Sequence, residues 1–150
     1  MSERFDIVVI GGGTAGLTVA SGTARFGAHV ALIERDRLGG ECLWTGCVPN
    51  KALIRSARMV ADIRRGADFG LAPTNPGVDF PSLMASMRTA REAVGRHDDP
   101  ERFREMGIEV IRGEASLLEG GRIRVDGREL SSRKTVMTTG SGLGSRQFQD

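Results

Sequence analysis

The stretch from residue 7 to residue 34 constrains the fold of this chain more than any other part of it. It begins with Ile7–Ile10, a run of four β-branched residues that is typical of a strand buried on both faces of a parallel sheet. Small and apolar residues then recur at helical spacing over residues 17–26, and Gly27 follows as a stop signal. Residues 29–33 show a second apolar strand pattern. The order strand, helix, strand predicts a β-α-β unit with parallel strands.

Three glycines, at positions 11, 13 and 16, separate the first strand from the helix. Gly11 permits a tight turn, Gly13 lets the backbone approach a pyrophosphate, and Gly16 lets the helix pack closely on the strand. The phosphates would lie on the N-terminus of the helix. Glu34 ends the second strand, 18 residues after Gly16, where it can accept a hydrogen bond from a ribose hydroxyl. This pattern favours dinucleotide binding over a purely structural turn, but it does not separate FAD from NAD.

Both cysteines of the chain, Cys42 and Cys47, lie in the next segment, and four residues separate them. Two thiols this close can form a disulfide if their side chains converge, which a regular helix through both positions would not allow. Pro49 fits either the first turn of a helix or a local distortion within one. In both cases Cys47 lies near a helix N-terminus, where the dipole and the free amides favour a thiolate.

Two other readings of the cysteines stay open at this point. Both could be small buried hydrophobic residues, as free cysteines often are. A zinc site would need about four ligands, and the two histidines, His29 and His97, are distant in sequence. The cysteine segment alone therefore favours a redox pair and a buried pair about equally.

The composition narrows the class of protein and its compartment. The 150 residues suffice for one domain with its own core. The net charge is +2 because 21 basic residues are scattered among 19 acidic ones, so no nucleic-acid-binding surface is expected. The short apolar run near the N-terminus fits neither a signal peptide nor a membrane span. We therefore expect a cytoplasmic protein, in which a close cysteine pair is more often catalytic or metal-binding than structural.

In the rest of the chain, the sequence pattern predicts three helices, which are followed by several short strands. The predicted segments are helices at 52–65, 81–94 and 100–106, strands at 108–111 and 134–138, and a hairpin of 122–125 and 128–130 around Asp126–Gly127. Together with the β-α-β unit, they predict an α/β fold. We expect a Rossmann-like domain with a mainly parallel sheet, helices on both faces and a small antiparallel meander.

The glycine fingerprint and the cysteine segment together resemble the pyridine nucleotide–disulfide oxidoreductases, the family of dihydrolipoamide dehydrogenase, glutathione reductase and mercuric reductase. The resemblance rests on Gly11 to Gly16, on Glu34, and on the pattern Gly-Gly-x-Cys-x-x-x-x-Cys-x-Pro-x-Lys that begins at Gly39. The wording Leu-Trp-Thr-Gly-Cys-Val-Pro is most similar to the mercuric-reductase-like branch. The resemblance covers nearly the whole chain and implies an FAD-binding domain at residues 1–141.

The resemblance implies FAD as the cofactor, implies no metal, and assigns catalytic roles to Cys42, Cys47 and Lys51. Cys42 would be the interchange thiol that meets the substrate, and Cys47 would be the thiolate that faces the flavin. Lys51 would lie near the N5 edge of the flavin, and the backbone at Ala115 would lie against the adenine. The residues expected to bind the cofactor are Gly11, Gly13, Thr14, Ala15, Gly16, Glu34, Arg35, Gly40, Glu41, Cys42, Lys51, Ala115, Thr139 and Gly140.

The resemblance also implies a function. The first hypothesis is the FAD-binding, disulfide-containing part of a flavoprotein oxidoreductase that passes electrons from NAD(P)H through FAD to Cys42 and Cys47, and then to a disulfide or Hg(II). The alternative is a truncated FAD-binding module without turnover. An ordinary NAD-dependent dehydrogenase would leave the cysteine motif unexplained.

The sequence also gives expectations about the end of the chain. Residues 142–150 predict a frayed tail. We expect the nicotinamide domain and the homodimer-interface domain of the family to be absent from this chain, so that NAD(P)H would act only if the missing domain were supplied.

Overall fold

The computed structural model describes residues 3–140. Its described residues form two compact units, one of residues 3–40 with 99–140 and the other of residues 41–98. The tail expected at 142–150 and the domain end expected at 141 lie outside the described residues.

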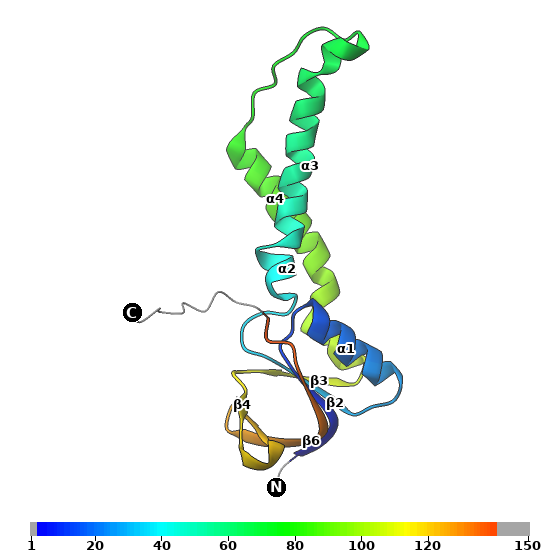
Figure 1. Ribbon diagram of the computed structural model, residues 1–150, viewed down its shortest axis with the longest axis vertical. Coiled ribbons are helices and arrows are strands. Elements are labelled where there is room, and N and C mark those ends of the chain that lie inside the picture. The colour runs from blue at the N-terminus through cyan, green and yellow to red at the C-terminus, as the bar shows by residue number, and fades with distance from the viewer. Residues whose placement is uncertain (1–2, 141–150) are drawn as a thin grey trace, which may run out of the picture. The chain divides into compact units, whose positions relative to one another are not determined.

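The first unit is built on a six-stranded sheet, part of which is labelled in Figure 1. The strands lie in the order β3-β2-β1-β6-β5-β4. β1 pairs in parallel with β2 on one side and with β6 on the other, and β2 pairs in parallel with β3. β5 runs antiparallel to both β6 and β4, so the mainly parallel α/β sheet and the small meander are confirmed. The strands are β1 Glu3–Ile10, β2 Val30–Glu34, β3 Ile108–Arg112, β4 Ser116–Leu117, β5 Ile123–Val125 and β6 Arg128–Met137.

The strand order defines where a ligand is expected to bind. The chain passes from β1 to β2 and β3 on one side of β1, and later returns to β6 on the other side. The carboxyl ends of β1 and β6 therefore lie at the topological switch point, where open α/β sheets bind their ligands.

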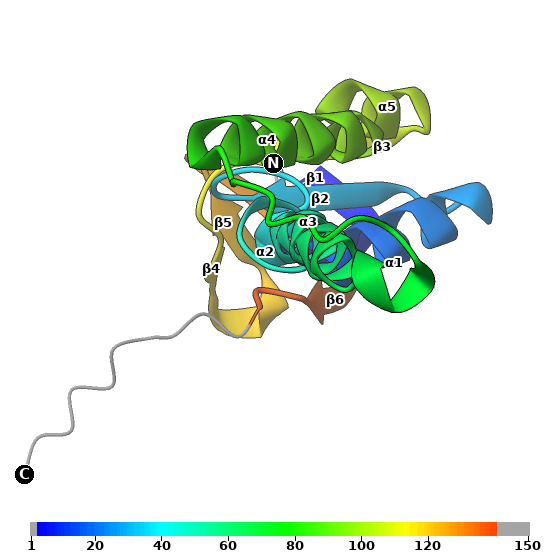
Figure 2. The same ribbon diagram turned by 90° about the horizontal axis from the view of Figure 1, so that it is seen from above.

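Two clusters of buried side chains hold this unit together. On one face of the sheet, Leu17 from α1 (Thr14–Arg25) and Phe103 from α5 (Pro100–Glu105) pack with strand residues such as Leu32. Figure 2 shows α1 alongside β1 and β2, which it contacts. Buried strand residues fill the second cluster, so the meander supplies the covering layer there: Phe5, Val8, Ile10, Ala31, Ile33, Ile111, Ile123, Val125 and Leu130.

Two strands are longer than the sequence predicts. β1 begins at Glu3 rather than Ile7, because its polar first residues pair with β6. The predicted segments 128–130 and 134–138 are one continuous strand, so treating them as separate elements is wrong. Ser131 and Ser132 interrupt the apolar pattern of β6, but both pair with β1, and backbone pairing continues through them.

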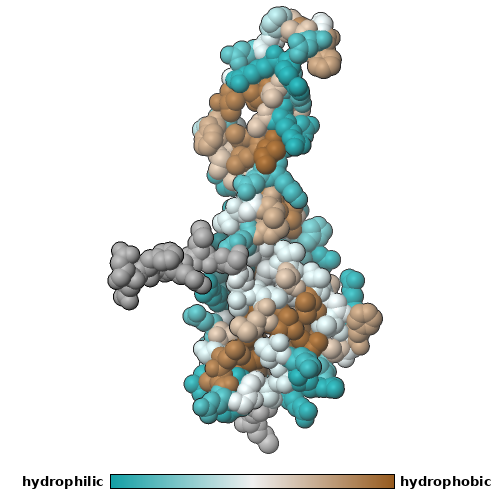
Figure 3. All heavy atoms as spheres, viewed as in Figure 1, coloured by the Kyte–Doolittle hydropathy of each residue, from teal (hydrophilic) through white to brown (hydrophobic). Residues whose placement is uncertain are grey.

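The second unit is helical. It contains α3 (Cys47–Arg64) and α4 (Phe80–Gly95), which pack side by side in both ribbon views, and the short α2 (Gly40–Trp44) precedes α3. Hydrophobic surface lies along the pair of helices α3 and α4 (Figure 3), so the second unit buries only part of its apolar side chains by itself. The large exposed apolar residues here are Ile54, Met59, Ile63, Phe69, Leu71, Val78, Phe80 and Val94. Within residues 3–140, none of the helices combines the length and apolar character that crossing a membrane requires.

Candidate functional site

The turn between β1 and α1 requires glycine at two positions. Gly11 has a φ of +107°, and a Cβ built on it would lie 2.3 Å from the carbonyl oxygen of Thr138. A Cβ built on Gly16 would lie 1.9 Å from the carbonyl oxygen of Gly11. The tight turn and the close helix packing that the fingerprint predicts at these positions are therefore present.

Gly13 differs because its surroundings are open. Its φ is −77°, and a Cβ there would approach only the Cα of Gly40, at 3.9 Å. Gly13 is also the N-cap of α1, and its carbonyl accepts the first helical hydrogen bond, from Leu17. The amides of Thr14 and Ala15 precede that bond and have no partner within the helix. A glycine N-cap with unpaired amides is the arrangement that binds phosphate.

The N-caps of the helices separate into two kinds. The N-caps of α4 and α5 are Asp79 and Asp99, and each side chain accepts a hydrogen bond from an amide of its first turn. In α1 and α3 the N-cap is Gly13 or Gly46, with no side-chain cap and no acidic residue in the first turn. α1 begins at the predicted phosphate site and α3 begins at Cys47. In both helices the N-terminal amides therefore have no side-chain cap, and no acidic residue of the first turn offsets the positive end of the helix dipole.

Glu34 lies at the end of β2, and both of its carboxylate oxygens are held by backbone amides. Oε2 accepts from the amide of Gly12 at 2.6 Å, and Oε1 accepts from the amide of Asp36 at 2.8 Å. The carboxylate is thus fixed beside the glycine turn, and each oxygen keeps a further lone pair for another donor. Its predicted neighbour Arg35 is exposed and forms an ion pair of 3.8 Å with Glu114.

Thr138 belongs to this site, although only its neighbours Thr139 and Gly140 are expected from the sequence to bind the cofactor. Its Oγ1 donates to the carbonyls of Gly11 at 2.8 Å and Ile10 at 3.1 Å, so the end of β6 holds the glycine turn in place. The predicted residues Thr139 and Gly140 follow it and are exposed. What could have indicated Thr138 in the sequence is its position at the end of the last predicted strand, which returns to pair with β1.

A glycine pair supports the turn from the other side. The amide of Gly39 donates to the carbonyl of Gly12 at 2.8 Å, and Gly39 forms a parallel bridge with Gly13. A Cβ on Gly40 would lie 2.8 Å from the Cα of Gly13. Ala115, by contrast, is half-buried against the cluster on the other face of the sheet, and no described contact joins it to the glycine turn.

The cysteines converge because the chain changes helix between them. Cys42 lies in α2, and Cys47 is the first residue of α3. Pro49 is buried in the first turn of α3, which confirms the first of its two predicted placements. Cys42 is half-buried and Cys47 is exposed, so the reading of both as buried hydrophobic residues is wrong. Among the described residues, no cluster of three or more His, Cys, Asp or Glu is placed to hold a metal ion.

The two thiols interact with each other and with a lysine. A hydrogen bond with Cys42 is the largest cause that raises the pKa of Cys47, followed by the charge of Cys42 and by some loss of solvation. The charge of Lys51 and the backbone at the start of α3 lower the same pKa, but they do not outweigh the effect of Cys42. The start of α3 thus favours the Cys47 thiolate as expected, but the neighbouring thiol has the larger effect, so the pKa of Cys47 in the reduced pair is raised.

These opposing effects predict how two variants change the reactivity of Cys47. Cys42→Ser removes the charge that opposes the Cys47 thiolate and leaves a hydroxyl that can donate to it, so the pKa of Cys47 should fall. Lys51→Met removes a favourable charge, so this pKa should rise. Because the thiolate is the nucleophile, alkylation of Cys47 by iodoacetamide at pH 8 should be faster in Cys42→Ser and slower in Lys51→Met, as followed by peptide mass spectrometry. Equal rates in Cys42→Ser and the unmodified chain would contradict the assigned cause.

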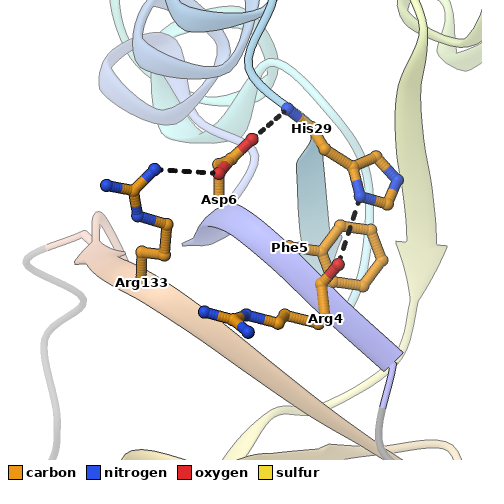
Figure 4. A pocket seen from close by; sticks show the side chains of 5 residues that line it. All are labelled: Arg4, Phe5, Asp6, His29 and Arg133. Atoms are coloured by element: carbon orange, nitrogen blue, oxygen red, sulfur yellow. Dashed lines mark hydrogen bonds and ion pairs between the residues drawn. The ribbon is translucent and has the colours of Figure 1, made fainter.

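A second concave surface lies at the amino end of β1 (Figure 4). The hollow has a volume of about 320 Å³ and is lined by Arg4, Phe5, Asp6, His29 and Arg133. The amide of His29 donates to Asp6 at 3.0 Å, and Arg133 pairs with Asp6 at 3.5 Å; both lower the pKa of that carboxyl. Because dinucleotides bind at the carboxyl ends of parallel strands, this hollow is separate from the glycine site.

Comparison with known proteins gives the family. The family profile described as pyridine nucleotide-disulphide oxidoreductase matches residues 5–148. The chain belongs to this family, and the match covers its flavin-binding part.

The relatives are flavoprotein disulfide oxidoreductases. A dihydrolipoyl dehydrogenase of Chlamydia pneumoniae is 33% identical over 144 residues, which are 94% of this chain and 31% of that protein. A mercuric reductase of Lysinibacillus sphaericus is 28% identical over 139 residues, which are 93% of this chain and 26% of that protein. The chain therefore spans between about a quarter and a third of these relatives.

Solved structures give the same fold. LpdA of Mycobacterium tuberculosis superposes with a TM-score of 0.73 at 26% identity, over 90% of this chain and 31% of that one. The HOCl-induced flavoprotein disulfide reductase RclA of Escherichia coli superposes with a TM-score of 0.71 at 28% identity, over 90% of this chain and 28% of that one.

Proposed function

We propose that this chain is the FAD-binding, dithiol-carrying part of an oxidoreductase that passes electrons from NAD(P)H to a disulfide or to Hg(II). The observation that carries the proposal is the occurrence, in one chain of this family, of an open glycine N-cap at the switch point and two thiols in hydrogen-bond contact. A structural turn would need neither the open surface at Gly13 nor the uncapped amides of α1.

The residues of the first unit fit FAD in two places. The uncapped start of α1 at Gly13, Thr14 and Ala15 would hold the pyrophosphate. Glu34 would accept from the ribose, since its backbone contacts fix its position and leave lone pairs free. The remaining residues proposed to contact the cofactor are Gly11, Gly16, Arg35, Gly40, Ala115, Thr139 and Gly140 in this unit, and Glu41, Cys42 and Lys51 in the second.

The second unit would supply the dithiol chemistry. When Cys42 and Cys47 form a disulfide, the two thiols lose two electrons and two protons, and the reverse reaction requires both to be returned. FAD, when bound, supplies the step between a two-electron hydride donor and such a thiol pair. We assign the interchange role to Cys42 and the flavin-facing role to Cys47, and Lys51 favours the thiolate of Cys47 by its charge.

The alternative, an FAD-binding module without turnover, shares the fold and the site. It differs only in whether NAD(P)H reduces the bound flavin. Both proposals therefore depend on FAD binding, which is the first property to test.

Reconstitution with FAD tests this function. The purified chain is incubated with excess FAD, desalted, and examined by its visible spectrum; we expect retained flavin absorbance. Tight binding of NAD with no retained flavin would overturn the proposal. The FAD-loaded protein is then mixed with NADH and with NADPH. Flavin bleaching that saturates with NAD(P)H concentration would support turnover, and the absence of bleaching would favour the non-catalytic module.

A further inference from the structure

One face of α4 packs against Leu43 and Trp44, the last two residues of α2, which lie between the two cysteines. Leu43 is only 3% exposed, and a Cβ built on Gly95 would lie 3.6 Å from its Cδ2 atom. The next residue, Trp44, has the guanidinium carbon of Arg91 at 5.2 Å from its ring centroid. Arg91 and Gly95 are four residues apart on a helix and therefore share a face. The last two residues of α2 thus rest on consecutive turns of α4.

Arg91 carries a feature that packing does not explain. Its Nε atom is buried and has no hydrogen-bond partner among the described residues. A buried donor without a partner is unfavourable, and a methionine would cover Trp44 without that penalty. A planar guanidinium, however, stacks on an aromatic face and adds a cation–π attraction. The arginine is therefore suited to fixing Trp44 rather than to filling space.

We propose that Arg91 is a positioning residue for the Cys42–Cys47 pair. By stacking on Trp44, it keeps the segment between the cysteines in the conformation that brings the two thiols together. This inference rests on the proposed redox function of the pair. In the disulfide the covalent bond itself closes the loop, whereas in the dithiol only non-covalent contacts do so. Loss of the stack should therefore loosen the dithiol more than the disulfide and make disulfide formation less favourable.

Equilibration with glutathione measures this effect on the whole chain without flavin. The reduced pair reacts with oxidised glutathione to give the protein disulfide and two reduced glutathiones. Each cysteine loses one electron and one proton, and the glutathione disulfide accepts both electrons and both protons. We expect Arg91→Met to lower the equilibrium constant about two- to fivefold, the range that a partly exposed cation–π contact supports. Arg91→Lys keeps the charge and should retain part of the effect.

Arg88 supplies the matched control. It lies on the same helix, three residues earlier, and is exposed. Arg88→Met should leave the equilibrium constant unchanged. Trp44 is the single tryptophan of the protein, so its fluorescence reports directly on the stack. Its emission in the reduced protein should shift in Arg91→Met and remain the same in Arg88→Met.

A double-mutant cycle tests whether Arg91 acts through Trp44. Trp44→Leu should lower the glutathione equilibrium constant, and adding Arg91→Met to it should have no further effect. An equilibrium constant that Arg91→Met leaves unchanged, or lowers equally in the Trp44→Leu background, would overturn the positioning role. If Arg91→Met shows no cooperative urea transition, the glutathione equilibrium constant is measured for Arg91→Lys and Trp44→Leu instead. Equilibrium constants unchanged in both variants would overturn the positioning role.

The same assay separates this inference from the proposed function. If the unsubstituted chain forms no disulfide with oxidised glutathione, the redox function fails and the positioning role fails with it. If it forms the disulfide and the Arg91 variants behave like the unsubstituted chain, only the positioning role is refuted. FAD binding does not enter either result.

Discussion

Replacing Gly16 by alanine should destabilise the first unit by about 3 kcal/mol or more. Inserting a methylene into a well-packed core typically costs about 1–3 kcal/mol when side chains can shift. Here the new Cβ would lie 1.9 Å from a backbone oxygen, that of Gly11, and 2.7 Å from Oγ1 of Thr138. Relief of this clash requires α1 to move away from β1, which would break its packing on the sheet. The measurement is urea unfolding followed by circular dichroism, in which the midpoint should fall sharply or the transition should disappear.

Gly22 gives a control on the same helix with the opposite sign. A Cβ built there meets nothing within 4 Å, and Gly22 lies in the interior of α1. Alanine in place of a helical glycine typically adds about 0.5–1 kcal/mol of stability, so Gly22→Ala should raise the urea midpoint. If Gly16→Ala raised the urea midpoint as Gly22→Ala does, α1 could not approach the end of β1 as closely as described.

The sequence predicts the elements whose signal is local. The apolar run of β1, the helix after the glycines and the second strand are all recovered, since each depends on residues within one segment. The hairpin around Asp126–Gly127 is confirmed for the same reason, because both residues adopt the positive φ that its tight turn requires. The tight turn expected at Gly11 and the close helix packing expected at Gly16 are likewise present, because a side chain at either position would clash with the backbone.

Features that depend on distant partners are the ones that the sequence misses. The continuity of β6 through Ser131 and Ser132 is decided by pairing with β1, more than a hundred residues away. Thr138 lies in a segment that resembles a family motif, but its hydrogen bond to the glycine turn forms only because β6 ends beside that turn. Arg91 resembles the solvated arginines of a helix until α4 brings it over Trp44.

The pKa of Cys47 shows how a correct local rule can be outweighed. A helix N-terminus and a nearby Lys51 both favour a thiolate, and both act in that direction here. The sequence places Cys42 five positions earlier, but it does not show that the two sulfurs form a hydrogen bond. Once they do, the neighbouring thiol dominates and the direction of the shift reverses.

Gly13→Val should remove FAD binding while leaving the fold intact. Gly13 has a negative φ that a valine can adopt, and the nearest atom to a Cβ there is 3.9 Å away. The expected cost to folding is about 1 kcal/mol, because valine is a poorer N-cap than glycine. The valine side chain would, however, occupy the surface through which a pyrophosphate reaches the amides of Thr14 and Ala15. Loss of two charge-assisted hydrogen bonds corresponds to about 3 kcal/mol or more, and so to at least about a 100-fold weaker affinity.

Within this one motif, Gly16 is therefore needed for close packing of the helix on the strand, and Gly13 is needed for access of the pyrophosphate. FAD titration followed by flavin fluorescence should give no saturable binding for Gly13→Val, although its urea midpoint stays close to that of the unsubstituted chain. Gly77→Val is the matched control, since Gly77 lies in an exposed loop with nothing within 4 Å of its Cβ, and this variant should bind FAD normally. If a well-folded Gly13→Val bound FAD as tightly as Gly77→Val, the pyrophosphate would have to be bound away from the start of α1. The uncapped helix N-terminus would then lose its proposed role.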